Sequence, residues 1–154
     1  MFFKGNLMPP SSADHSEIAA LVYRYARFVR QGFGAACGDL FVNDASYEIF
    51  EADGDDASAP RRLRTKLEGR TQIGGYISAS TQRGIRLCPL IHNLIIDRDG
   101  DSATANSVLE GRTWPAGHET IGEYEDCIVR VQGRWLFASR SFTMFVTRDE
   151  AHDA

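Results

Sequence analysis

The chain has 154 residues, of which 43% are hydrophobic and 25% are charged, with a formal net charge of −4. This length and composition are typical of one globular domain. The negative charge argues against a nucleic-acid-binding protein, which needs a basic face, and no apolar run in the sequence is long enough to span a membrane. The three cysteines are widely spaced, without a C-x-x-C pair, so we expect reduced thiols and a cytoplasmic protein.

The first part of the sequence is predicted to be mainly helical. Residues 1–13 end in a Pro-Pro-Ser-Ser run and are expected to form a flexible arm. Asp14 and Glu17 form a capping box, which predicts that a helix begins at Asp14. Apolar side chains then recur every three or four residues over 18–29, so this helix should bury one face. A second, short helix is predicted over residues 35–41.

The middle of the chain is predicted to mix strands with turns. Residues 46–50 have strand character, and residues 51–60 form an acidic loop rich in turn residues. A second strand is predicted over residues 62–67. A short helix is then expected to begin at Thr71, whose hydroxyl can cap it.

The most informative stretch is the predicted strand over residues 87–97, which is apolar on both faces. Strict alternation along this strand would place on one face Leu90, His92, Leu94 and Ile96. Ile91 and Ile95 would then lie on the other face. Both faces therefore need cover, one from helices and the other from a second sheet or a second subunit.

Hairpin signals dominate the rest of the chain. Asp99-Gly100 and Gln132-Gly133 are two-residue turns of the kind that joins antiparallel strands. Around them and the turn at 114–117, strands are predicted over residues 102–112, 119–131 and 134–147. Helices followed by a meander of strands indicate an α+β domain over residues 14–147, with helices on one face of the sheet and a tail over 148–154.

Several common functional motifs are absent from the sequence. It has no serine nucleophile elbow, no G-x-G-x-x-G and no phosphate loop. Asp97-x-Asp99-x-Asp101 is similar to the start of a calcium loop, but the glycine falls at the wrong position, which favours a hairpin turn. The four histidines lie in unrelated contexts, so we expect no metal site and no cofactor.

Some polar residues fall on elements that otherwise look buried. They are Tyr25, His92, Asn106, Tyr124, Asp126 and Arg140. Because an unpaired buried polar group costs about 1–3 kcal/mol, each needs a partner in the protein or in a ligand. For His92, a hydrogen-bonded core position and a site position both remain open. For Arg140, ligand binding and an internal ion pair with Asp126 or Glu110 both remain open.

Short motifs spread along the chain are together similar to those of one known group of domains. They are Arg24-Tyr25-Ala26, Leu40-Phe41-x-x-Asp44, Gly69-x-x-x-Ile73, His92-Asn93, Asp99-Gly100-Asp101-x-Ala103, Gly122-x-Tyr124-x-Asp126, Val129-Arg130-x-x-Gly133-x-Trp135 and Arg140. On these motifs the chain resembles the SnoaL-like branch of the nuclear-transport-factor-two-like superfamily over nearly its whole length. The resemblance implies a cone-shaped roll, with N-terminal helices packed on the concave face of a strongly curved, mostly antiparallel sheet.

The resemblance leaves two functions open. Relatives in this superfamily include scytalone-type dehydratases, ketosteroid isomerases, polyketide cyclases and non-catalytic subunits of ring-hydroxylating dioxygenases. The first implied function is dehydratase, isomerase or cyclase chemistry on an apolar cyclic or polyketide-like molecule, by a cofactor-independent lyase or isomerase. The second is a non-catalytic protein that binds a small molecule, or assembles as a subunit, through the same cone. Many relatives pair through their sheets, which implies a homodimer.

The enzymatic hypothesis assigns a role to individual residues. His92 would move a proton, Tyr25 would donate a hydrogen bond to a developing oxyanion, and Asp126 or Glu110 would supply a carboxylate. Residues expected to contact the substrate are Tyr124, Arg140, Asn106, Trp114, Leu90, Leu94 and Phe28. Dehydratase-like relatives have an Asp near the end of the first helix, whereas the matching position here is Arg30, which would make His92 less basic if it pointed inward.

Overall fold

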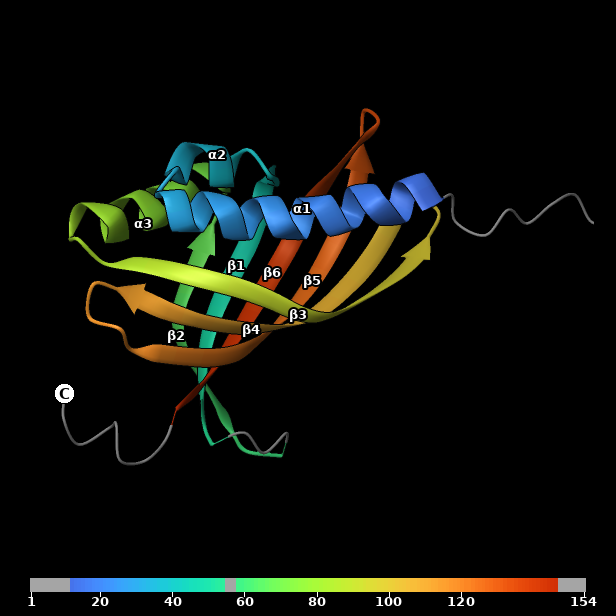
Figure 1. Cartoon of the computed structure of the whole chain (residues 1–154). Helices are drawn as coiled ribbons and strands as arrows, with labels where there is room; N and C mark the ends of the chain where they lie inside the picture. Colours follow the sequence, from blue (N-terminus) through green and yellow to red (C-terminus); the bar gives the residue numbers. More distant parts are fainter. Residues whose placement is uncertain (1–11, 55–57, 147–154) are drawn as a thin grey trace, which may run out of the picture.

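The chain folds as helices packed on one face of a curved sheet, as a computed structural model shows (Figure 1). The structure describes residues 12–54 and 58–146. Its helices are α1 (Ser12–Gln31), α2 (Gly34–Gly38) and α3 (Arg70–Gln82). Its strands are β1 (Phe41–Asp53), β2 (Arg61–Glu68), β3 (Arg86–Asp99), β4 (Ser102–Trp114), β5 (Glu119–Val131) and β6 (Arg134–Val146). The predicted arm and tail lie outside the described residues, apart from the first two residues of α1.

The described strands form one six-stranded sheet in the order β2-β1-β6-β5-β4-β3. Neighbouring strands are antiparallel except β1 and β6, which are parallel. The sheet is curved and open, and the helices lie over its concave side (Figure 1). We call the side that the helices cover the inner face and the opposite side the outer face. The predicted α+β cone with a mostly antiparallel sheet is confirmed.

Helix α1 is attached to the sheet by an apolar stripe and by ion pairs at its first turn. The predicted stripe is buried at Ile18, Leu21, Val22 and Tyr25. The helix begins at Ser12, so Asp14 lies inside the first turn rather than at the predicted cap. Its carboxylate oxygens lie 3.0 Å from Arg98 of β3 and 3.1 Å from Arg130 of β5. These contacts, favourable near a helix N-terminus, hold α1 across the sheet.

The two shorter helices differ from their predicted bounds for local reasons. Helix α2 ends at Gly38 rather than at residue 41, because Phe41 already begins β1. Helix α3 begins at Arg70, one residue before the predicted start at Thr71. The residue before it, Gly69, has a φ of 83°, a left-handed conformation that glycine adopts without strain.

Both predicted two-residue hairpins are confirmed. In the β3–β4 turn, Gly100 has a φ of 59°, and in the β5–β6 turn Gln132 and Gly133 have φ values of 49° and 77°. Such positive values suit the tight turns that match the twist of antiparallel strands. These turns fix the register of β3 with β4 and of β5 with β6, and so decide which side chains face inward.

Strand β3 contains a bulge that the sequence did not reveal. Asn93 has a φ of 50°, and the register between β3 and β4 shifts between His92 and Ile95. An extra residue in one strand lets two neighbouring side chains lie out of alternation. The inward and outward positions therefore exchange at this point in the strand.

The bulge changes the predicted faces of β3. Ile91, Leu94 and Ile96 pack against the core, whereas Leu90 and Ile95 are 59% and 60% exposed on the outer face. The expectation that His92 shares a buried face with Leu94 and Ile96 is therefore wrong. Alternation with a period of two holds only until an inserted residue inverts it.

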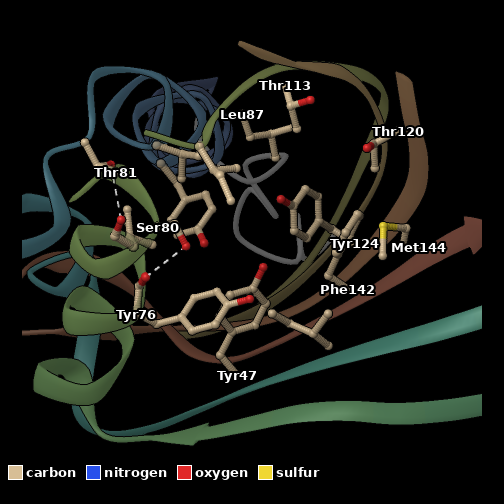
Figure 2. A pocket seen from close by; sticks show the side chains of 15 residues that line it. Tyr47, Tyr76, Ser80, Thr81, Leu87, Thr113, Thr120, Tyr124, Phe142 and Met144 are labelled. Carbon is tan, nitrogen blue, oxygen red and sulfur yellow. Dashed lines mark hydrogen bonds between the residues drawn. The ribbon is translucent and has the colours of Figure 1, made fainter. Parts of the chain in front are cut away.

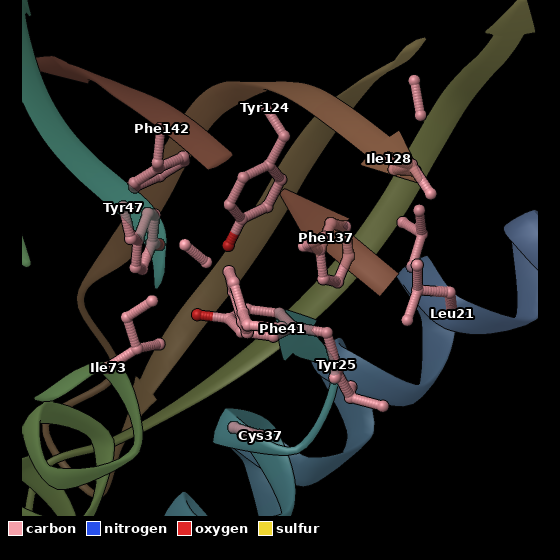
Figure 3. Packing of buried hydrophobic residues seen from close by; sticks show 14 of the residues in the cluster. Leu21, Tyr25, Cys37, Phe41, Tyr47, Ile73, Tyr124, Ile128, Phe137 and Phe142 are labelled. Carbon is pink, nitrogen blue, oxygen red and sulfur yellow. The ribbon is translucent and has the colours of Figure 1, made fainter. Parts of the chain in front are cut away.

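The core lies between α1 and the inner face and is rich in aromatic rings (Figure 3). Tyr25 of α1 meets the edge of Phe41 with ring centroids 5.9 Å apart, and Phe41 lies 5.0 Å from Phe137. Edge-to-face and tilted pairs of this kind stabilise a core beyond the area that they bury. Toward α3 the packing opens into a cavity.

Candidate functional site

A cavity of about 330 Å³ lies between the inner face and helices α1 and α3. Figure 2 shows side chains from the helices and from the sheet surrounding it. Its size falls in the range of small-molecule sites, which are about 300–1,000 Å³ and mostly apolar. The cone therefore holds a site large enough for a small organic ligand.

Three of the lining residues are tyrosines that pack against one another, Tyr25, Tyr47 and Tyr124, which we call the tyrosine floor. The ring of Tyr25 meets those of Tyr47 and Tyr124 edge-on, with centroids 6.3 Å and 6.4 Å apart. The three residues come from α1, β1 and β5, and Figure 3 shows them packed together. The floor thus brings three hydroxyl groups from distant parts of the sequence into one place.

Burial keeps the hydroxyls of the tyrosine floor protonated. It raises the pKa of Tyr25, Tyr47 and Tyr124 above the ordinary value, because a phenolate loses its hydration in the core. Interactions between the hydroxyl of Tyr47 and those of its two neighbours add smaller effects on each pKa. All three groups are therefore hydrogen-bond donors at neutral pH.

The remaining walls of the cavity carry no formal charge. Apolar side chains form most of them, from Val29, Ile49, Ile77, Ile85, Leu87, Phe142 and Met144. The other lining side chains carry hydroxyls and belong to Tyr76, Ser80, Thr81, Thr113 and Thr120. No lining residue within the described ranges is an Asp, Glu, His, Lys or Arg. The cavity favours an uncharged, mostly apolar body with a few oxygen atoms.

Asp126 and Arg140 do not line this cavity but lie buried beneath the tyrosine floor. The Nε and Nη2 groups of Arg140 donate hydrogen bonds to the two carboxylate oxygens of Asp126, at 2.8 Å and 3.2 Å. Both side chains are 0% exposed. Burial raises the pKa of Asp126, while Arg140 acts in the opposite direction. Of the alternatives for Arg140, the structure therefore shows the internal pair with Asp126, not with Glu110.

His92 lies on the outer face, away from the cavity. Its Nε2 is 3.1 Å from a carboxylate oxygen of Glu110 on β4, and the two side chains are 46% and 63% exposed. The expectation that His92 lines the pocket is wrong, because it rested on a strand without a bulge. Glu110 does meet His92, but in solvent rather than at the site.

The other predicted contacts divide between the two faces. Tyr25 and Tyr124 line the cavity. Leu94 and Phe28 pack against the core but do not line the cavity. The predicted contacts that lie exposed outside the cavity are Leu90, Asn106 and Trp114. Alternation explains the outer position of Asn106, since its neighbours Ala105 and Ser107 are buried.

Arg30, which matches the Asp of dehydratase-like relatives, is exposed near the end of α1. Only Tyr25 and Val29 of that helix line the cavity. Arg30 therefore neither replaces a carboxylate in the cavity nor faces His92 across it. In the described part of the chain, no three His, Cys, Asp or Glu side chains gather as a metal site would require.

Tyr47 and the lining residues of α3 are not among the site residues that the sequence predicts. Tyr47 shares a face of β1 with Ala45 and Ile49, and this spacing of two predicts its ring on the buried face. The residues of α3 gave no comparable signal, because Gly74, Gly75 and small polar side chains interrupt its apolar pattern. Their position at the cavity depends on how α3 crosses the sheet.

Comparison with known protein families shows which family the chain belongs to. A model of the SnoaL-like domain matches residues 10–141. The chain belongs to the SnoaL-like family. None of the curated proteins matches it significantly, so the family is shown but no characterised activity comes with it. A fold that serves many functions does not by itself name the reaction.

Solved structures support the same fold. A protein of unknown function from Mycobacterium tuberculosis is 24% identical with a TM-score of 0.69, over 86% of this chain and 76% of its own. Two proteins from Novosphingobium aromaticivorans are also similar. One is provisionally described as a scytalone dehydratase, with 18% identity, a TM-score of 0.68 and coverage of 87% and 85%. The other is provisionally described as the beta subunit of an aromatic-ring-hydroxylating dioxygenase. It is 17% identical with a TM-score of 0.71, over 88% of this chain and 92% of its own.

Sequence identities this low show a shared fold but do not identify a ligand, which has to be argued from the residues of the site. None of the helices in the described ranges is long and apolar enough to cross a membrane. The cavity with its tyrosine floor is therefore the feature from which a function can be argued.

Proposed function

We propose that this SnoaL-like protein binds a small, apolar, cyclic molecule whose oxygen accepts hydrogen bonds from the tyrosine floor. The observation that carries the proposal is a cavity of about 330 Å³ with mostly apolar walls and a cluster of three protonated tyrosines in its lining. Apolar walls bind the body of such a ligand, and a few placed donors orient it.

Binding is favoured over the acid–base chemistry expected for His92. General acid–base catalysis needs a titratable group within hydrogen-bond reach of the reacting atom, about 2.6–3.2 Å or through one water. The lining residues of the cavity include no carboxylate and no imidazole within the described ranges. Proton removal by His92 would require the ligand to lie on the outer face instead.

A titration with 2-naphthol, followed by its fluorescence, tests the proposal. We expect 2-naphthol to bind the native protein, and Tyr124→Phe to weaken this binding by about 2- to 10-fold through the loss of a donor. Naphthalene, which has no oxygen, should bind both proteins equally. His92→Gln is the matched control and should leave both affinities unchanged. Failure of 2-naphthol to bind, or loss of binding in His92→Gln, would overturn the proposal.

We also propose that a second copy of the chain covers part of the outer face. Leu90, Ile95 and Ile121 are each more than half exposed on β3 and β5, and we call them the outer patch. A groove of about 250 Å³ is lined by Leu90, Ile121 and Glu110, among other residues. Clustered apolar side chains of this kind mark interaction surfaces.

The mass of the protein in solution tests the pairing. We expect a dimer by light scattering after gel filtration, and a monomer for the variant that combines Leu90→Glu with Ile95→Glu. Leu63→Glu, at an exposed apolar residue on β2 at the far edge of the sheet, should leave the dimer intact. A native monomer, or a dimer that survives both charged substitutions, would exclude this interface.

A further inference from the structure

The charge that acts on the tyrosine floor comes from a residue that does not line the cavity. Arg140 is 1% exposed and is one of the largest fully buried side chains of the described residues. Asp126 accepts hydrogen bonds from its Nε and Nη2 groups. The Nη1 group has no hydrogen-bond partner. A buried polar nitrogen without such a partner calls for another kind of contact.

Aromatic rings provide that contact. The Cζ atom of Arg140 lies 3.7 Å from the ring centroid of Tyr124, 4.3 Å from that of Tyr25 and 4.6 Å from that of Phe137. A guanidinium within about 6 Å of a ring face is attracted by the negative charge of that face. Two of the three rings belong to the tyrosine floor. The cation is thus packed directly against the back of the site.

The ion pair is oriented with respect to the cavity. Arg140 lowers the pKa of all three tyrosines of the floor, against the larger effect of burial. Asp126 raises the pKa of Tyr124, by less than Arg140 lowers it. The guanidinium is therefore the end of the pair that packs against the rings of the floor. In a low-dielectric core such an arrangement acts strongly over short distances.

We infer that the cavity prefers ligands whose buried oxygen is negatively charged, in the form of a phenolate, and that Arg140 is the positioning residue that creates this preference. The inference rests on the proposed function and narrows its ligand class. Arg140 acts through Tyr25 and Tyr124, which it polarises and holds in place, while the hydroxyls make the contact. Donors fixed in advance and aimed at a negative oxygen stabilise it without reorganisation.

The ligand class that follows is acidic phenols. The aromatic ring of a phenol suits the apolar walls of the cavity, and its oxygen suits the tyrosine donors.

Binding of 4-nitrophenol tests the inference, because the absorbance of this probe distinguishes its neutral and ionised forms. We expect the native protein to bind the phenolate at least about tenfold more tightly than the phenol, which lowers the pKa of the bound probe by about one. The variant that combines Asp126→Leu with Arg140→Met replaces the pair with apolar side chains of similar size. It should bind the neutral phenol and lose the preference for the phenolate.

A second variant covers the case in which that replacement does not fold. Tyr25→Phe with Tyr124→Phe keeps the ion pair and the rings but removes two donors, and it should also lose most of the preference. A native protein that binds both forms equally would overturn the inference and leave the proposed function standing, as would a preference that survives either variant. If neither form binds, and 2-naphthol also fails, both proposals fall together.

Discussion

Two pairs of an acidic and a basic side chain lie on neighbouring strands of the same sheet, and they differ mainly in solvent exposure. Arg140 and Asp126 approach to 2.8 Å on the inner face with both side chains 0% exposed. His92 and Glu110 approach to 3.1 Å on the outer face, where both are about half exposed or more. Water screens the outer pair, whereas the inner pair is buried from water and packs against aromatic rings. Distance alone therefore does not identify the pair that matters to the site.

The largest effect expected from this comparison is on stability. Asp126→Ala would leave Arg140 buried without its counterion, which should lower the free energy of unfolding by about 3–5 kcal/mol. Urea unfolding followed by circular dichroism measures it. Replacing both partners, by Asp126→Leu with Arg140→Met, should recover most of the loss, because no uncompensated charge remains. A loss for Asp126→Ala as small as for Glu110→Ala would contradict the contrast between the faces.

The cysteines extend the comparison to pH. Burial raises the pKa of the Cys37 thiol to about 12, whereas Cys127 is exposed on β5. In the unfolded chain the Cys37 thiol ionises near its ordinary pKa of about 8.5. Its contribution to the free energy of unfolding is therefore complete below that pH. Above it, the free energy of unfolding should fall by about 1.4 kcal/mol for each pH unit. Urea unfolding between these pH values measures the slope.

Two variants test whether Cys37 causes this dependence of the free energy of unfolding on pH. Cys37→Ala should flatten it over the range in which only the thiol ionises, below the ordinary tyrosine pKa of about 10. Cys127→Ala should leave the slope unchanged, because this side chain is already exposed in the folded chain. An equal effect of the two substitutions would show that burial does not separate these positions.

The smallest effect is expected on the outer face. His92→Gln removes a pair whose members are largely solvated, and such pairs contribute about 0–1 kcal/mol. Added salt should reduce even this difference, since the pair lies in solvent. Thermal unfolding at low and high ionic strength measures it. A loss of several kcal/mol would mean that His92 is buried in solution, for example by the second copy of the chain.

The sequence predicted the fold more fully than the site, for physical reasons that particular residues illustrate. Periodicity identified α1 and the glycine turns identified two hairpins, since both signals are local. The resemblance then supplied the cone. The bulge at Asn93 left no recognisable signal, and it moved His92 to the outer face. One inserted residue was enough to reverse the most specific functional prediction.

The tyrosine floor shows why sites are harder to predict than elements. Tyr25 and Tyr124 are polar residues on elements that the sequence predicts to be buried, and both line the cavity. Tyr47 completes the floor only because β1 pairs with β6 in parallel, which places it opposite Arg140. Such long-range pairing depends on the whole sheet. The role of Arg140 likewise became visible only through its distances to the rings.

A crystal structure of the protein with 2-naphthol tests the central claim most directly, because it shows which face of the sheet holds the ligand. The account predicts the naphthol oxygen about 2.6–3.2 Å from the hydroxyl of Tyr25 or Tyr124, with its rings against the apolar walls of the cavity. A naphthol bound beside His92 and Glu110 on the outer face, with none in the cavity, would contradict it.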